Sequence, residues 1–256
     1  MDAVTKHSGI SIESDRLDLF HEILLRRCNG ELFMAPIGTN PQRILDLGTG
    51  TGIWAIDMAR ILILFLGDKF PSAQVLGNDL SPIQPTLVPP NVAFEVDDVE
   101  NDWVYSQQFD FIHARYLAGA IKDWSRLIDQ AFKFTRPGGW VEFQDFDMEF
   151  YTLHGDFAPG CSLDRWTKMV VNGLKQMGAE PEPGPKLKGW LKDARFINIH
   201  EKVLPIPVGI WPKSEEMLVG NPRRYKYFLL TSGKILKTAG YKCNTTSTWC
   251  TVKDLR

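Results

Sequence analysis

The feature that most constrains this chain is a short apolar strand that runs directly into three alternate glycines. Residues 44–47 read Ile-Leu-Asp-Leu, the next five are Gly-Thr-Gly-Thr-Gly, and an amphipathic run follows at 53–59. Glycine adopts backbone conformations that a Cβ would forbid and allows close approach to a ligand. A helix start behind such a turn offers unpaired N–H donors. The pattern predicts a cradle for a nucleotide-type cofactor; the alternative is a strand, turn and helix without a ligand.

The glycine spacing discriminates between cofactors. A dinucleotide fingerprint places its third glycine or alanine three residues after the second, and Ile53 stands at that position here. The spacing therefore disfavours NAD. Alternate glycines after a strand-borne Asp46 resemble the first motif of class I methyltransferases, whose ligand is S-adenosylmethionine (SAM). The resemblance implies that Asp46 faces the methionine amino group of SAM, directly or through water. The residues that it assigns to the cofactor are Asp46, Gly48, Thr49, Gly50 and Gly52.

A second apolar strand is expected at 74–80, where Asp79 and Leu80 form its end. In this fold the carboxylate at that position accepts the ribose hydroxyls. Asp79 lies 27 residues after Gly52, against about 20 expected, and removing residues 60–67 would restore the usual distance. The alternative is that Asp79 is a turn residue before the Ser-Pro pair that follows.

A third strand at 92–96 leads to Asp97, Asp98 and Val99. Parallel strands that end at one edge bring such side chains together. We expect Asp98 to accept the adenine amino group, while the N–H of Val99 meets a ring nitrogen. The alternative is that both aspartates are solvated at a strand end.

The fourth and fifth strands are expected at 109–114 and 140–146. Because the sulfonium of SAM activates its own methyl group, the protein chiefly aligns the acceptor and excludes water, and a general base is optional. The fourth strand should open beside the methyl group, so its end carries the candidates for positioning the acceptor: His113, Arg115 and Tyr116. The alternatives are that His113 is a strand residue whose hydrogen bonds are made within the protein, that Arg115 is an ion-pair partner, and that Tyr116 forms part of the wall of the site.

Four longer segments carry a more specific resemblance. They are GTGTGIWAIDMA (48–59), the stretch 78–103, the stretch 109–132 and PGGWVEFQDFD (137–147). Together they resemble the fungal LaeA-like methyltransferases, and the likeness runs from about residue 13 to residue 212. The resemblance implies a Rossmann-like α/β fold with a mostly parallel sheet covered by helices on both faces, and bound SAM. It also implies either methylation of a small molecule or a regulatory role with a protein partner.

Two segments depart from that family. Residues 61–66 are six consecutive large hydrophobic residues, too few for a membrane span of about 20. They would extend the first core helix by roughly two turns. A retained intron would also produce such an apolar sequence. After residue 212 the resemblance to the family ends. Residues 225–230 are the candidate for a closing strand. We therefore expect a SAM-binding domain at 1–212, with part of a substrate lid, and a divergent basic tail at 213–256.

The N-terminal segment predicts a helix that begins at Ser14 as its N-cap. Leu17, Phe20 and Leu24 recur at i, i+3 and i+7, which places them on one face. We expect this stripe to cover the sheet or the mouth of the cofactor site.

Composition narrows the class of protein. The chain has 256 residues and a net charge of −2, which argues against general affinity for nucleic acid. The tail at 213–256 carries +6 and the remainder −8. Four scattered cysteines and five histidines without ligand spacing predict neither a disulfide framework nor a metal site. Without a signal peptide or membrane span, the protein is expected in the cytosol or nucleus.

Overall fold

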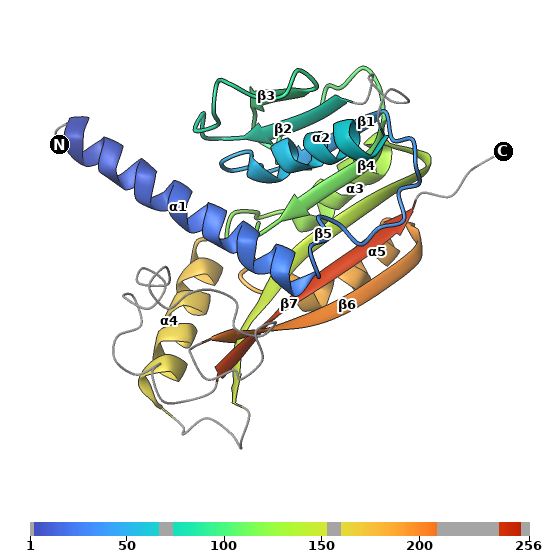
Figure 1. Cartoon of the computed structure of the whole chain (residues 1–256). Helices are drawn as coiled ribbons and strands as arrows, with labels where there is room; N and C mark the ends of the chain where they lie inside the picture. The colour runs from blue at the N-terminus through green and yellow to red at the C-terminus, as the bar shows by residue number, and fades with distance from the viewer. Residues whose placement is uncertain (1–2, 67–73, 153–159, 209–240, 252–256) are drawn as a thin grey trace.

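A computed structural model describes residues 3–66, 74–152, 160–208 and 241–251. Within those ranges the chain forms one sheet of seven strands with helices on both faces (Figure 1). The strands are β1 (Arg43–Leu47), β2 (Gln74–Asp79), β3 (Val92–Val96), β4 (Phe109–Arg115), β5 (Thr135–Thr152), β6 (Ile197–Val208) and β7 (Tyr241–Thr251). The helices are α1 (Ala3–Arg27), α2 (Ile53–Leu66), α3 (Trp124–Phe134), α4 (Ser162–Gln176), the 3-10 turn η2 (Gly184–Lys186) and α5 (Leu187–Asp193).

The sheet has the strand order β3-β2-β1-β4-β5-β7-β6. Strands β1 to β5 are parallel, and β7 runs antiparallel to both β5 and β6. The order reverses between β1 and β4, and ligands of open α/β sheets bind at such a switch point, beyond the carboxyl ends of the strands. This is the predicted Rossmann-like class I methyltransferase fold. It places the end of β1 beside the end of β4.

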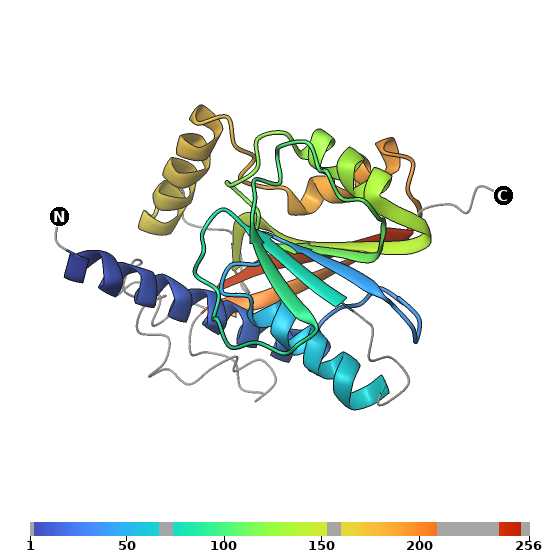
Figure 2. The same ribbon diagram turned by 90° about the horizontal axis from the view of Figure 1, so that it is seen from above.

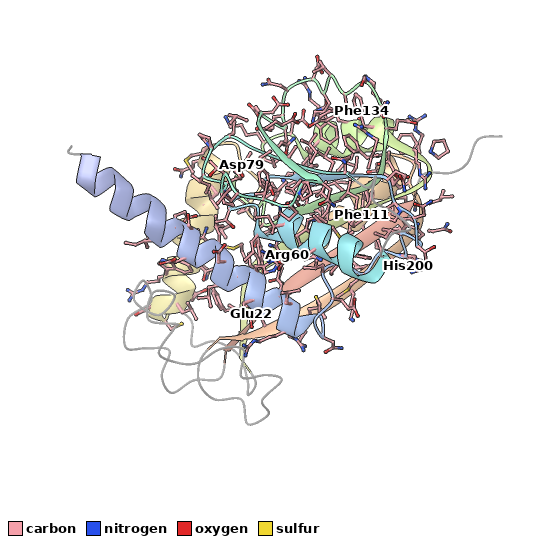
Figure 3. The ribbon with its side chains drawn as sticks, turned by 45° about the horizontal axis from the view of Figure 1, so that its top comes forward. Glu22, Arg60, Asp79, Phe111, Phe134 and His200 are labelled. Atoms are coloured by element: carbon pink, nitrogen blue, oxygen red, sulfur yellow. The ribbon has the colours of Figure 1, made fainter. Side chains whose placement is uncertain are left out.

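The two faces of the sheet carry separate apolar cores. Figure 2 shows α1 and α2 on one side of the sheet and α3 and α5 on the other. The α2 side includes Trp54 and Phe111, whereas the α3 side includes Leu127 and Phe134. Phe111 and Phe134 are labelled in Figure 3. Cover on both faces explains why β4 is buried from Phe109 to Ala114, including the polar residues Asp110 and His113, since a parallel strand has no solvent side.

Helix α1 is longer than the sequence predicts. It begins at Ala3, so Ser14 lies inside the helix and is not its N-cap. No proline occurs before Pro36, and therefore nothing in the backbone stops the helix from extending toward the N-terminus. The helix ends as glycine-terminated helices do: Gly30 has φ +85° and donates its N–H to the carbonyl of Leu25 at 2.7 Å.

Three further elements test the expectations for the departing segments. Helix α2 continues through Leu66, so the apolar insert does extend this helix. Strand β5 starts before and ends after the predicted range of 140–146. The sheet is closed by β7, from the 213–256 segment, which pairs between β5 and β6. Strand β7 was not predicted from the sequence, and the predicted closing strand, 225–230, lies outside the described residues.

Candidate functional site

The glycine loop after β1 is built from left-handed backbone. Gly48, Gly50 and Gly52 have φ values of +62°, +58° and +78°, which only glycine adopts without strain. Close neighbours also exclude side chains: a Cβ on Gly48 would lie 2.5 Å from Leu117 Cδ2, and one on Gly52 would lie 2.3 Å from Phe94 Cζ. The loop therefore needs glycine for its conformation and for its packing.

The carboxylate of Asp79 closes this loop against β2. One of its oxygens accepts the Gly50 N–H at 2.9 Å, and the other accepts the Ser81 N–H at 2.9 Å. Gln84 donates its side-chain amide to the Gly50 carbonyl at 2.6 Å. Leu80, predicted to line the cofactor, is 69% exposed. Asp79 thus holds the glycine loop in place and stands at the carboxyl end of β2.

The predicted adenine residues follow β3 at the same edge of the sheet, because β3 pairs in parallel with β2. Asp98 accepts the N–H of Glu100 at 3.0 Å, and its own N–H is bonded to Asp97 at 2.8 Å. Val99 is buried in the core on the α3 side. The structure therefore brings Asp46, Asp79 and Asp98 to neighbouring strand ends.

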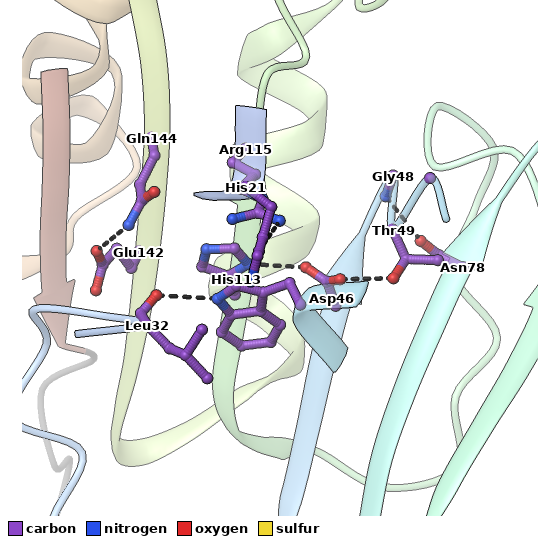
Figure 4. A network of polar contacts seen from close by, with 12 residues as sticks. His21, Leu32, Asp46, Gly48, Thr49, Asn78, His113, Arg115, Glu142 and Gln144 are labelled. Atoms are coloured by element: carbon purple, nitrogen blue, oxygen red, sulfur yellow. Dashed lines mark hydrogen bonds and ion pairs between the residues drawn. The ribbon is translucent and has the colours of Figure 1, made fainter. Parts of the chain in front are cut away.

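A buried polar network lies under the glycine loop. Asp46 accepts a hydrogen bond from Nδ1 of His113 at 2.7 Å and another from the hydroxyl of Thr49 at 2.6 Å (Figure 4). The His113 ring stacks on the indole of Trp54, with centroids 3.8 Å apart and planes 4° from parallel. The indole N–H of Trp54 in turn donates to the Leu32 carbonyl at 2.9 Å.

A second polar chain ties helix α1 to this face of the sheet. The guanidinium of Arg115 donates to Nδ1 of His21 at 2.7 Å, and Nε2 of His21 donates to Asp57 at 3.1 Å. Burial lowers the pKa of Arg115, which still stays charged. The hydrogen bond from His21 lowers the pKa of Asp57. These hydrogen bonds join β4, α1 and α2.

Two other contacts place α1 on the glycine loop itself. Asp18 accepts a hydrogen bond from the Thr51 hydroxyl at 2.7 Å. A Cβ on Gly50 would lie 3.2 Å from a methyl group of Leu17. Of the predicted stripe, Leu17 therefore lies against the loop, whereas Phe20 packs against Tyr116 and Phe146.

The end of β4 carries an aromatic cluster. Tyr116 has φ +57°, an unusual conformation for a bulky residue, and its ring stacks on Phe146 at 4.5 Å and meets Phe20 edge-on at 5.2 Å. The following residue, Leu117, donates its N–H to the carboxylate of Asp145 at 2.9 Å. Burial raises the pKa of Asp145 to about 7.

Several residues of the site escape sequence reasoning. His21 and Glu142 are ionisable side chains that are buried in the folded protein. Their roles become visible only from the hydrogen bonds that they make there. Glu142 accepts the N–H groups of Met34 and Ala35 at 2.7 and 2.9 Å, which fixes the segment before β1. Phe94 reads as an ordinary strand residue in the sequence. No local signal marks its contact with Gly52.

In the ranges that the structure describes, no three His, Cys, Asp or Glu side chains form a group that could hold a metal ion. No helix in those same ranges is long and apolar enough to cross a membrane.

Comparison with known proteins shows to which family the chain belongs. A family model described as a methyltransferase domain matches residues 21–201. The chain belongs to the methyltransferase-domain family. Methyltransferase pytC of Aspergillus terreus is 44% identical over 206 residues, which cover 80% of this chain and 61% of that protein. The secondary metabolism regulator LAE1 of Cochliobolus heterostrophus is 35% identical over 78% of this chain and 64% of that protein. These relatives confirm the LaeA-like resemblance.

This methyltransferase-domain chain spans about three fifths of the length of the curated relatives it matches. Among solved structures, phosphoethanolamine N-methyltransferase 2 of Haemonchus contortus, in complex with SAM, superposes with a TM-score of 0.53 at 19% identity. The match covers 84% of this chain and 49% of that one. At this identity the likeness shows the fold alone.

Proposed function

We propose that this chain is a SAM-dependent methyltransferase of the cytosol or nucleus that modifies a small molecule of fungal secondary metabolism. The observation that carries the proposal is the left-handed glycine bend at the end of β1, with Asp79 at the end of the adjacent strand β2 and Asp98 just after β3, the next strand along the sheet. The name of pytC, the 44% identical relative, supports methyl transfer as the reaction.

The donor and acceptor groups at these strand ends fit SAM. Each oxygen of Asp79 accepts one backbone N–H, so each keeps a lone pair for a ribose hydroxyl. Asp98 has accepting capacity left for the adenine amino group, beside the Val99 N–H. Asp46, Gly48, Thr49, Gly50 and Gly52 would hold the methionine part, with Leu80 beside the ribose.

SAM would supply the activated methyl group, and the chain's own residues would orient the acceptor and exclude water. Arg115 and Tyr116 lie at the open end of β4, where an acceptor would approach, and His113 lies one layer deeper. Helix α1 covers the loop through Leu17 and Asp18 and thereby limits access of water. No metal is needed for this chemistry.

The first test is calorimetry with SAM and S-adenosylhomocysteine (SAH) on the wild type and on Asp79→Ala. We expect binding by the wild type and a loss of about tenfold or more in the variant, because a charged hydrogen-bond acceptor is removed. Asp102→Ala is the control, since the Asp102 side chain is 90% exposed in a surface ion pair with Arg126. Equal binding by the wild type and Asp79→Ala would exclude the assigned role of Asp79.

A regulator that acts through a protein partner is the second candidate. It is favoured by the name of LAE1, the regulator that is 35% identical to this chain. If the wild type binds neither SAM nor SAH, the methyltransferase proposal fails and the regulator is favoured. If Asp79→Ala abolishes binding but the variant still restores metabolite production in a deletion strain, regulation does not need the cofactor.

A further inference from the structure

His113 has one polar contact among the residues that the structure describes. Its side chain is fully buried, and its Nδ1 lies 2.7 Å from Asp46. Nε2 has no hydrogen-bond partner in the described part of the chain. A buried polar atom without a partner costs free energy, and a phenylalanine here would avoid that cost. The bond from Nδ1 to Asp46 is therefore the contact that distinguishes histidine from an apolar ring.

The ring is also held in a single orientation. His113 and Asp46 are register partners on the neighbouring strands β4 and β1. The Trp54 indole lies parallel to the imidazole at 3.8 Å, and its own N–H is tied to the Leu32 carbonyl. An imidazole clamped in this way aims its Nδ1–H at one oxygen of the carboxylate, while Thr49 binds the other (Figure 4).

Two donors on a carboxylate fix its plane. Asp46 is only 2% exposed, and each of its oxygens accepts one hydrogen bond from the protein. Each oxygen retains accepting capacity. A carboxylate that is oriented by two donors and almost excluded from solvent, at the carboxyl end of β1, is suited to binding an ammonium group.

We propose that His113 is a positioning residue for the cofactor, which acts through Asp46 on the ammonium of the methionine part of SAM. This inference rests on the proposed function. It separates His113 from Arg115 and Tyr116, which stand nearer to the acceptor, because the His113 side chain is closed off beneath Trp54 and contacts Asp46.

The test compares three variants and two ligands. Asn places an amide N–H where Nδ1 stands, Gln places one where Nε2 stands, and Phe keeps a ring against Trp54 without any donor. SAH carries the ammonium group, whereas 5′-methylthioadenosine lacks the whole amino-acid part. Calorimetry measures the dissociation constants of both ligands for the wild type, His113→Asn, His113→Gln and His113→Phe.

We expect His113→Phe and His113→Gln to weaken SAH binding by about tenfold to a hundredfold, as for a lost hydrogen bond to a charged group. His113→Asn should recover most of that loss, and methylthioadenosine should bind all four proteins within about threefold. Equal weakening of both ligands by His113→Phe, or no weakening of SAH, would overturn the inference. A wild type that binds methylthioadenosine and SAH with equal affinity would overturn it as well. Absence of SAH and methylthioadenosine binding by the wild type would instead overturn the proposed function.

If His113→Phe unfolds the chain, His113→Asn and His113→Gln carry the comparison. Both are amides, and the additional methylene of Gln moves its N–H from the position of Nδ1 to that of Nε2. Tighter SAH binding by the Asn variant, with equal melting temperatures, supports the inference. Equal SAH binding by the two variants contradicts it.

Discussion

Gly52 and Phe94 show how a cofactor loop is supported by a neighbouring strand. The Phe94 ring occupies the space into which a Cβ on either Gly52 or Gly77 would project. Gly52 therefore serves both the bend of the loop and the packing of the ring. Gly77, in β2, serves the packing alone. Replacement of Gly52 should expose both requirements.

We expect Gly52→Ala to destabilise the fold by about 1–2 kcal/mol from its left-handed backbone alone, and by more because the Cβ would meet Phe94 at 2.3 Å. Urea unfolding measures the loss. The matched control is Gly189→Ala in helix α5, where nothing lies within 4 Å of the added Cβ, so stability should be unchanged or rise by up to about 1 kcal/mol. Addition of Phe94→Leu should recover part of the Gly52→Ala loss. Equal effects of the two glycine substitutions would contradict the packing argument.

At the scale of elements, helix α1 is held on the core by the apolar packing of Ile23 and Leu24 and by a few buried polar contacts. His21, 3% exposed, links Arg115 of β4 to Asp57 of α2. Most of the other face of the helix is exposed and carries surface pairs such as Glu22–Arg26. Glu22 is labelled on that helix in Figure 3. The buried pairs, and not the surface pairs, should decide whether α1 stays on the loop.

His21→Ala should destabilise α1 by about 2–3 kcal/mol, because it leaves the partly buried Arg115 and Asp57 without their shared partner. Hydrogen exchange at the α1 amides should accelerate more than exchange in β1 and β4. Glu22→Ala is the control and should change stability by less than about 0.5 kcal/mol, since its ion pair is half exposed. Uniform acceleration across the sheet would show that His21 supports the whole fold and not α1 in particular.

At the scale of the whole molecule, two carboxylates, the buried Asp145 and the partly buried Asp57, give stability opposite dependences on pH. The pKa of Asp145 is raised to about 7 by burial. The unfolded chain therefore releases this proton first, near pH 4, and the folded chain holds it until about pH 7. Stability from this group falls as pH rises from about 4 to 7 and is level above. Asp57, with its pKa lowered by His21, loses its contribution only below about pH 4.

Urea unfolding at pH 5 and pH 8 should reveal the Asp145 effect. A rise of about three pKa units corresponds to roughly 4 kcal/mol as an upper bound, with most of the decrease between pH 4 and 7. Asp145→Asn has no such proton and should remove this slope, while Asp102→Ala, at an exposed position, should retain it. If Asp145→Asn keeps the same slope, the titrating group lies elsewhere.

Some features of this protein follow from its sequence alone. Alternate glycines after Asp46 indicate the cofactor loop, because no other residue type adopts that backbone without strain. Apolar runs ending in Asp79 and Asp98 indicate the parallel strands and the edge at which they meet. These signals are local: each depends on a few consecutive residues, and so a linear pattern is enough to predict them.

Other features were decided only by the tertiary structure. The placement of α1 depends on contacts of Leu17, Asp18 and His21 with the loop, β4 and α2. The position of β7 depends on pairing with β5 and β6, strands distant in sequence. The burial of His113 beneath Trp54 joins residues 59 positions apart. The sequence does not distinguish a strand histidine that faces a methyl acceptor from one that donates a hydrogen bond to an aspartate. Its neighbours decide between those roles, because hydrogen bonding and burial are properties of surroundings that a sequence does not place in space.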